Sequence, residues 1–131
     1  MGARVLVAEV TSAASSAIRA YAHCTPGGQG NLTVLLINLS LNATTVSFGS
    51  LPTTPRSEYV LTPSTDPASS LTKDTGLLGT GVNLNGQLLK LSADGSLPQI
   101  DPKVVASGAA VGVPATGIAF VVLPASPACS A

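Results

Sequence analysis

The chain has 131 residues, which is the size of one domain and enough to bury a hydrophobic core. Only 9% of its residues are charged and its formal net charge is zero, so it lacks the basic stripe that a nucleic-acid-binding surface needs. Hydrophobic residues make up 45% of the chain, but aromatic residues only 3%. We therefore expect a single domain over residues 1–131 that has no nucleic-acid partner.

Short β-strand patterns follow one another along the first half of the chain. Arg4–Val10 is rich in Val, and Ile18–Cys24 alternates apolar and polar residues, as a half-buried strand does. Leu32–Leu39 is apolar on both faces, which predicts a central strand that is covered on two sides. Thr44–Phe48 follows after a short connection, and we expect it to pair with this central strand. Ser57–Thr62 is a further strand.

The second half of the chain continues the same pattern. Asn85-Gly86 lies within Val82–Leu91 and supplies the two positive-φ residues of a type I′ turn, which predicts a hairpin. Pro63–Gly81 is the longest irregular stretch, and we expect it to be a mobile loop. Ile118–Leu123 is the last strand. No helical spacing of apolar residues occurs, so the fold class is predicted to be all-β, an antiparallel β-sandwich of about seven or eight short strands.

Two segments resemble targeting or membrane signals in length or hydropathy. Val104–Ala125 is uncharged, but it contains Pro114 and three glycines, and its strongly apolar part is only as long as a strand. We therefore expect no transmembrane segment. Met1–Val10 is too short for a secretory signal and carries two charges. A chain of extracytoplasmic character without a signal is expected to be a fragment of a longer protein.

The two cysteines are placed as a clasp. Cys24 ends an early strand pattern and Cys129 lies close to the C-terminus. A bridge between them would close a loop of roughly 105 residues, worth about 4–5 kcal/mol in the chain-entropy model. Such a bridge belongs to an oxidising compartment. Two free, buried thiols are the alternative.

Three Asn-x-Ser/Thr sequences lie close together and fit the N-glycosylation pattern. The candidate acceptors are Asn31, Asn38 and Asn42. Asn42 lies in the expected turn and is the best acceptor, whereas Asn38 is expected to be partly sheltered at a strand end. These sites matter only if the chain enters the secretory pathway.

The sequence contains no complete active site. A glycosidase needs two carboxylates that face one sugar ring, but Glu9 and Glu58 lie in strand patterns and the aspartates in turns or before proline. His23 is the only histidine and has no cysteine or carboxylate at ligand spacing, so we expect a structural role. No nucleophile elbow or phosphate loop occurs. We predict no catalytic residue, metal or cofactor. The aspartates are Asp66, Asp74, Asp94 and Asp101.

Eight segments form an ordered series that covers nearly the whole chain. They are Met1–Leu6, Ile18–Thr25, Leu32–Leu39, Ser57–Thr62, Val82–Gly86, Leu97–Pro102, Ile118–Leu123 and Pro127–Cys129. This series resembles the C-terminal region of heparanase-like β-glucuronidases of glycoside hydrolase family 79, and it is most similar to the plant members. No single segment is decisive; the specificity lies in their order.

The resemblance implies a β-sandwich that packs against a (β/α)8 barrel. In that family the barrel carries the acid/base and nucleophile glutamates of a retaining mechanism, and both lie outside this chain. Neither Glu9 nor Glu58 matches a catalytic motif. The resemblance also implies that the sandwich borrows strand material from near the N-terminus of the enzyme, and that Cys24 and Cys129 occupy the family's clasp positions.

The resemblance further implies what the parent protein does. It would hydrolyse β-glucuronide bonds in acidic glycans, such as arabinogalactan side chains of the plant cell wall. It would be secreted to the extracellular space or cell wall, or reside in the lysosome or vacuole, or be associated with a membrane through the parent. The glycan would be bound through the parent only.

Two other classes of function remain open. One is an independent carbohydrate-binding or cell-surface adhesion sandwich, which would bind a glycan as an isolated monomer. Its four aromatic residues, Tyr21, Phe48, Tyr59 and Phe120, are too scattered in sequence to predict a sugar-binding platform. The other is a self-sufficient small hydrolase, which would turn over an aryl glucuronide without a partner.

Overall fold

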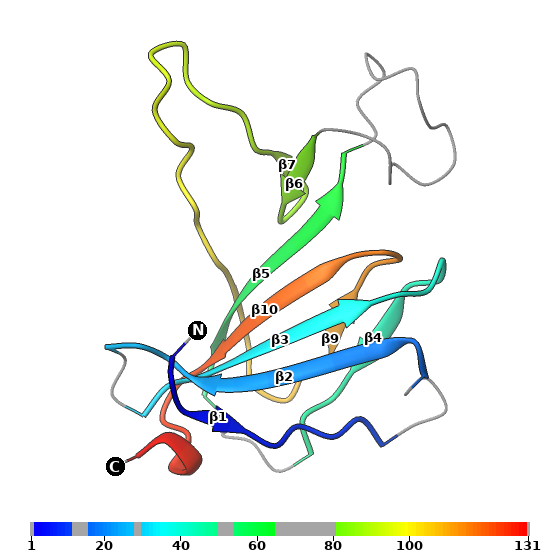
Figure 1. Ribbon diagram of the computed structural model, residues 1–131, viewed down its shortest axis with the longest axis vertical. Coiled ribbons are helices and arrows are strands. Elements are labelled where there is room, and N and C mark those ends of the chain that lie inside the picture. The colour runs from blue at the N-terminus through cyan, green and yellow to red at the C-terminus, as the bar shows by residue number, and fades with distance from the viewer. Residues whose placement is uncertain (1, 12–15, 28–29, 50–53, 65–80, 131) are drawn as a thin grey trace.

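The computed structural model describes residues 2–11, 16–27, 30–49, 54–64 and 81–130, which form ten β-strands and a short 3-10 turn (Figure 1). The strands are antiparallel and lie in two sheets, so the all-β prediction is confirmed. The predicted mobile loop, Pro63–Gly81, falls largely outside the described residues. Within those residues, no helix is long and apolar enough to cross a membrane.

The larger sheet has eight strands. Its central strand, β3, pairs with β2 on one side and with β10 on the other, and β5 follows β10. The prediction of a central strand is therefore confirmed, but the predicted cover on both faces is not, because the Leu35 and Ile37 side chains on one face are only half-buried. The strands of this sheet, in spatial order, are β1 (Val5–Leu6), β2 (Ile18–Cys24), β3 (Leu32–Asn38), β10 (Ile118–Leu123), β5 (Arg56–Pro63), β6 (Val82–Leu84) and β7 (Gln87–Leu88), with β8 (Lys103–Val105) also paired to β5.

The smaller sheet consists of β4 (Thr44–Val46) and β9 (Val111–Val113). The prediction that Thr44–Phe48 pairs with the central strand is wrong. Both edges of β3 are already hydrogen-bonded to β2 and β10, so the chain that leaves β3 enters the second layer. Figure 1 shows β4 and β9 lying across one face of the large sheet.

The core lies between the two sheets. Alternate residues of β2, β3 and β10 face inward, and they meet Val111 and Val113, which are both fully buried. The inward residues are small or of medium size, which allows the sheets to approach closely. The buried cluster consists of Ile18, Ala22, Leu32, Val34, Leu36, Val111, Val113, Ala119, Val121 and Leu123.

The predicted hairpin is confirmed. Asn85 and Gly86 have φ angles of 49° and 85° and connect β6 to β7. The Asn85 side chain also anchors the hairpin to β5, because its Oδ1 accepts a hydrogen bond from the Val60 backbone N–H at 2.9 Å. Its Nδ2 donates to the backbone carbonyls of Glu58 and Asp101.

Candidate functional site

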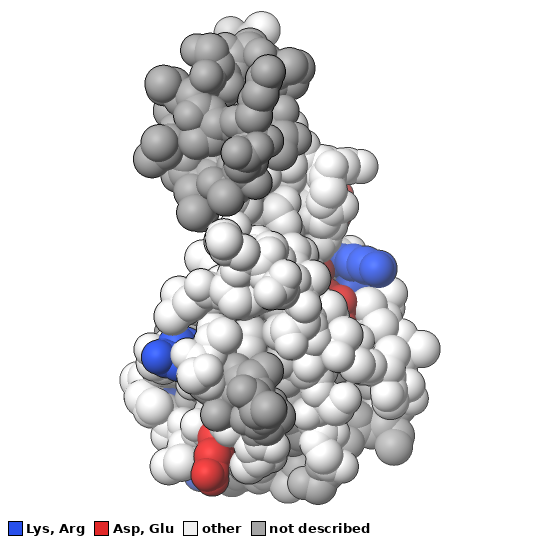
Figure 2. Space-filling model, turned by 90° about the vertical axis from the view of Figure 1, so that its right-hand side faces the viewer, with Lys and Arg blue, Asp and Glu red and all other residues white. Residues whose placement is uncertain are grey.

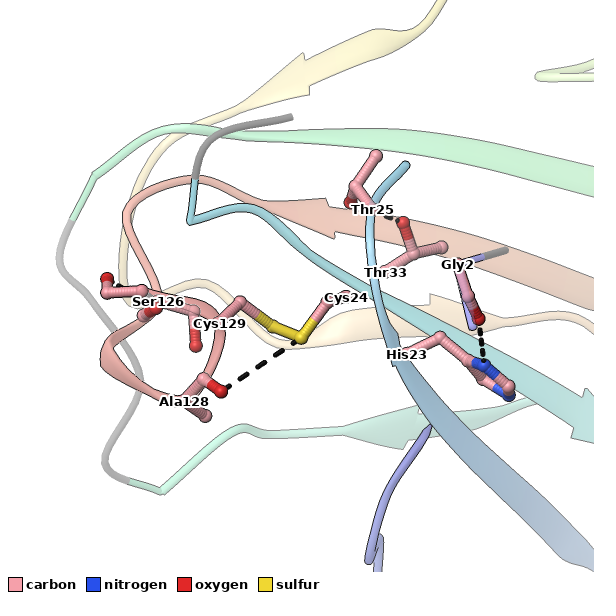
Figure 3. Close-up of a disulfide and its surroundings, with 9 residues drawn as sticks. Gly2, His23, Cys24, Thr25, Thr33, Ser126, Ala128 and Cys129 are labelled. Atoms are coloured by element: carbon pink, nitrogen blue, oxygen red, sulfur yellow. Dashed lines mark hydrogen bonds between the residues drawn. A yellow bond between two sulfur atoms is a disulfide. The ribbon is translucent and has the colours of Figure 1, made fainter. Parts of the chain in front are cut away.

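The clasp closes one end of the sandwich. Cys24, at the end of β2, and Cys129, in the 3-10 turn Pro127–Cys129, are joined by a disulfide, with their Cα atoms 5.4 Å apart (Figure 3). A hydrogen bond also holds the tail that carries Cys129, in addition to the disulfide. The Ser126 backbone N–H donates to the Gly30 carbonyl at 2.6 Å. The structure therefore has the bridge in place of two free thiols.

His23 has a structural partner. Its Nδ1 lies 2.8 Å from the Gly2 carbonyl oxygen, and since that oxygen can only accept, Nδ1 carries the hydrogen (Figure 3). The neighbouring Cys24 carbonyl accepts from the Gly2 backbone N–H at 3.0 Å. Both bonds hold the N-terminal segment against β2. Over the described ranges, no group of three or more His, Cys, Asp or Glu residues could hold a metal ion.

The carboxylates that the structure describes do not assemble into a catalytic pair. Glu58 is only 5% exposed, and its Oε1 accepts a hydrogen bond from Arg56 Nε at 2.8 Å and forms an ion pair with Arg56 Nη2 at 2.7 Å. A sugar ring could not reach it. Glu9 is exposed on the N-terminal segment, and Asp101 is exposed on a different part of the chain. Asp66 and Asp74 lie outside the described residues.

Asp94 has a local role. Its Oδ1 accepts a hydrogen bond from the Ser96 backbone N–H at 2.9 Å, within the turn that ends at Gly95 and Ser96. The Ser96 backbone and side chain lower the pKa of the Asp94 carboxyl, although the residue is fully exposed. This is the behaviour of a turn cap and not that of a general acid, which needs a raised pKa.

The three glycosylation candidates have different environments. Asn31 is half-buried at the start of β3. Asn38 is buried at the end of β3, where its side chain makes several hydrogen bonds. Asn42 is exposed in the turn between β3 and β4.

The most extensive feature is an apolar face on the side of the large sheet opposite the core. We call it the outer face and define it by Leu35 and Ile37 of β3, Ile118 and Phe120 of β10, and Tyr59 and Leu61 of β5. These residues align across the three strands in two rows. The rows are Leu35–Phe120–Tyr59 and Ile37–Ile118–Leu61, and all six residues are half-buried.

A cavity of about 460 Å³ opens on the outer face. It lies over Phe120, Tyr59 and Leu61, and Leu89 and Ile100 contribute to its wall from the segment that follows β7. That segment, residues 89–102, stands away from the sandwich in Figure 1, and we call it the arm. Leu97, on the arm, is 84% exposed. Figure 2 shows that charged side chains are few and scattered on the side of the molecule that it displays.

A second cavity, of about 750 Å³, lies between the two sheets. Its walls include inward residues of β2 and β3, Phe48 just after β4, and the N-terminal segment from Leu6 to Thr11. The small sheet has two strands where the large sheet has eight, so it covers only part of the inward face. Among the described residues, the second layer of the sandwich is therefore incomplete beside this cavity.

The outer face was not predicted as a site. Its signal in the sequence is the run Ile118–Leu123, which is apolar at every position and so cannot present a polar side to water. The structure also brings together three aromatic residues that are distant in sequence. Tyr21 lies opposite Leu35, in the same cross-strand row as Phe120 and Tyr59.

No protein-family model matches the chain. It is, however, similar to heparanases of three vertebrates. The mouse heparanase is 35% identical over 130 residues, the chicken heparanase 31% over 129 residues and the cattle heparanase 32% over 133 residues. Each alignment covers 94% of this chain but only 22–23% of the heparanase. The chain thus spans about a quarter of the length of these relatives.

Proposed function

We propose that this chain is the non-catalytic β-sandwich domain of a heparanase-like glycoside hydrolase of family 79, of the plant type. Two observations support the proposal: the part of the heparanase sequence that this chain matches, and the apolar character of both faces of the large sheet. The similarity to heparanase extends over 94% of the chain but over only 23% of the mouse enzyme. The large sheet of this chain is apolar on both faces. Within the described residues a second sheet lies on the core face, which it covers in part, and none lies on the outer face.

The outer face is suited to contact with another domain of the same polypeptide. Sheets with two apolar faces occur where both faces are packed against other elements. Contiguous exposed apolar surface is otherwise unfavourable and marks an interaction site. The occupant that we propose is the (β/α)8 barrel, which would pack on the outer face and be flanked by the arm. The near-zero charge of this chain is consistent with such a supporting role and not with binding of a polyanion.

The cavity between the sheets has a second proposed occupant. A β-strand supplied from elsewhere in the parent would extend the two-stranded sheet β4–β9 and fill the space against β2 and β3. Such strand addition satisfies the open backbone groups of a sheet edge and buries alternate side chains. This addition would complete the second layer of the sandwich.

The chemistry of the parent would lie outside this chain. The barrel would hydrolyse β-glucuronide bonds of acidic glycans by a retaining mechanism with its own pair of glutamates. Glu58 is buried against Arg56 and Glu9 is isolated on the surface, so neither is assigned a role in that reaction. The parent would act in the extracellular space, the cell wall or a lysosomal or vacuolar compartment.

The test has two parts. Transcript sequencing across the 5′ side of the gene is expected to reveal an in-frame barrel with two glutamates. The complete enzyme is then produced with Phe120→Lys or Leu61→Lys on the outer face, and its activity is measured on an aryl β-glucuronide. Because burying an unpaired charge is costly, we expect the yield of active enzyme to fall by about tenfold or more.

Leu41→Lys is the matched control, because Leu41 is an exposed apolar residue that lines neither cavity. It should leave the yield within about twofold, as surface substitutions usually do. Equal yields from the control and the outer-face variants would contradict the docking role. Turnover of the glucuronide by the isolated chain would contradict the non-catalytic role.

One observation favours a second candidate function, an independent carbohydrate-binding sandwich. The row that contains Tyr21, Phe120 and Tyr59 places three aromatic rings on one face, and Tyr21 is 49% exposed. Aromatic faces are common sugar contacts because a ring is apolar yet rigid. Titration of the isolated chain with glucuronic-acid-containing oligosaccharides distinguishes the two. Binding that is lost in Tyr21→Ala would favour this second function.

A further inference from the structure

The end of β3 is organised by one buried amide. Asn38 is 2% exposed, and its Nδ2 donates to the backbone carbonyls of Asn42 at 2.8 Å and Pro114 at 2.9 Å, with a longer contact of 3.3 Å to Val113. Its Oδ1 accepts from the backbone N–H and the hydroxyl of Ser40, at 3.0 and 2.9 Å. The amide therefore ties together the end of β3, the turn that follows it and the chain that leaves β9.

These bonds occupy the atoms that glycosylation would use. An N-glycan replaces one of the two Nδ2 hydrogens of asparagine with a bond to sugar carbon C1. Both hydrogens of Asn38 point to short hydrogen-bond acceptors, and the side chain is enclosed by protein. A glycan on Asn38 would have to break these contacts and leave buried carbonyl groups without donors, which is costly. Glycosylation of Asn38 is incompatible with this fold.

Asn42 has the opposite environment, four residues further along. Its backbone is fixed, because its carbonyl accepts from the Asn38 amide and its N–H donates to the Ser40 hydroxyl at 3.2 Å. Its side chain is exposed and makes no hydrogen bond to the part of the chain that the structure describes. Leu39 and Leu41, in the same turn, are 60% and 69% exposed, and a glycan at Asn42 could shield this apolar surface.

We propose that Asn42 is N-glycosylated in the folded protein and that Asn38 is an unmodified structural amide that presents the Asn42 turn to solvent. The proposal rests on the proposed function only for entry into the secretory pathway. There the Asn42 Nδ2 would lose a proton and attack C1 of an oligosaccharide carried on a lipid diphosphate. The C1–N bond forms, the C1–O bond to the diphosphate breaks, and the lipid diphosphate leaves.

The experiment measures occupancy at each asparagine. The complete polypeptide that contains this chain is secreted from a eukaryotic host behind an appended signal peptide. A glycan-releasing amidase in heavy-oxygen water then marks each formerly glycosylated asparagine as a labelled aspartate. Residues 20–56 form a single tryptic peptide that holds all three candidates, and its fragmentation spectrum assigns the label. We expect the label at Asn42 and none at Asn38.

Two variants separate the sequence pattern from the structural role. Thr44→Val removes the Asn42 glycosylation sequence while keeping a β-branched residue in β4, and we expect the loss of one glycan. Ser40→Thr keeps the hydroxyl that bonds Asn38 and Asn42 and keeps the Asn38 glycosylation sequence, and it should leave the glycan pattern unchanged. A labelled Asn38 in the secreted protein, an unlabelled Asn42, or gain of a glycan at Asn38 in Ser40→Thr would each overturn the proposal.

Failure of the Asn42 proposal can be distinguished from failure of the proposed function. A secreted protein that carries a glycan at Asn42 but has no glucuronidase activity contradicts the proposed function and leaves this site intact. An active glucuronidase with an unmodified Asn42 contradicts the site alone.

Discussion

The two faces of the large sheet use the same strands in different ways. On the core face, Leu36 is 1% exposed and its neighbour on β10, Ala119, is fully buried. On the outer face, Leu35 and its neighbour Phe120 are only half-buried. Both pairs belong to the same two strands in one register, so backbone geometry cannot explain the difference. The difference is that, within the described part of the chain, the small sheet covers one face and no second sheet covers the other.

This comparison shows that the strands carry enough apolar surface for two interfaces. A sheet that meets water on one side normally alternates apolar and polar residues, but β10 does not alternate. On the core face this chain supplies its own partial cover, the two-stranded sheet β4–β9. The outer face has large side chains such as Phe120 and Tyr59, which suits an interface with a partner domain.

Removal of the disulfide is expected to have the largest effect on the free energy of unfolding. It also sharpens the comparison between the core face and the outer face. Cys129 packs against the core cluster, so the clasp closes the core face and not the outer face. Replacing both cysteines with serine should lower the free energy of unfolding by about 4–5 kcal/mol, because the open chain gains the entropy that a loop of 105 residues had lost. Denaturant titration measures the loss, and the reduced wild-type chain is the matched control. A change below about 1 kcal/mol would show that the tail is held by its hydrogen bonds alone.

Truncation of adjacent leucines tests the comparison directly. Leu36→Ala should lower the free energy of unfolding by about 2–5 kcal/mol, because the Leu36 side chain is almost completely buried in the core cluster. Leu35→Ala in the same strand should cost only about 1 kcal/mol, because its side chain remains partly in water. Both are measured by denaturant titration of this chain. Equal losses would mean that the outer face is already packed and would break the comparison.

Asn38 gives a smaller effect at the end of the core. Asn38→Ala removes the donor to the carbonyls of Asn42 and Pro114 and the acceptor for Ser40, and should lower the free energy of unfolding by about 2 kcal/mol. Asn42→Ala is the control and should change stability by less than about 0.5 kcal/mol, since that side chain is exposed. Thermal unfolding of the unglycosylated chains measures both. The reverse ranking would contradict the assignment of Asn38 as the structural amide.

Sequence patterns predicted the elements that form locally. The hairpin at Asn85-Gly86 depends on two positive-φ residues, and the strand Ile18–Cys24 depends on alternation, so both were correct. The partner of β4 was wrong, because pairing depends on which edges are already occupied, and that is a property of the whole sheet. The strand β9 was missed, because Val111-Gly112-Val113 is too short to show a period and is a strand only through its pairing with β4.

The site was harder to predict for the same reason. The aromatic residues Tyr21, Tyr59 and Phe120 are far apart in sequence and meet only through the order β2–β3–β10–β5. The burial of Asn38 depends on carbonyl groups that lie 76 residues away, at Pro114. The disulfide was accessible to sequence reasoning because only one intramolecular pair is possible with two cysteines.

The smallest expected effect concerns the arm that flanks the outer face. The Ser96 backbone and hydroxyl hold the pKa of Asp94 below its ordinary value of 3.8. Since the folded chain favours the carboxylate more than the unfolded chain does, the contribution of Asp94 to stability is present above pH 3.8 and is lost as the pH falls through the lowered pKa. Titration of the Asp94 carboxyl by NMR should give a midpoint below 3.8, and Ser96→Pro, which removes the N–H donor, should raise it.

The titration of Asp94 tests whether the arm contributes to the difference between the core face and the outer face. Asp94 is exposed and remote from the core cluster, so protonation should loosen its turn without unfolding the sandwich. At acidic pH the protection of the Ser96 amide, relative to its intrinsic exchange rate at the same pH, should therefore fall while the amides of β3 and β10 stay protected. If β3 and β10 lose protection together with the turn, the arm and the core are one cooperative unit. The outer face would then be stabilised by the arm itself and would have less need of a partner domain.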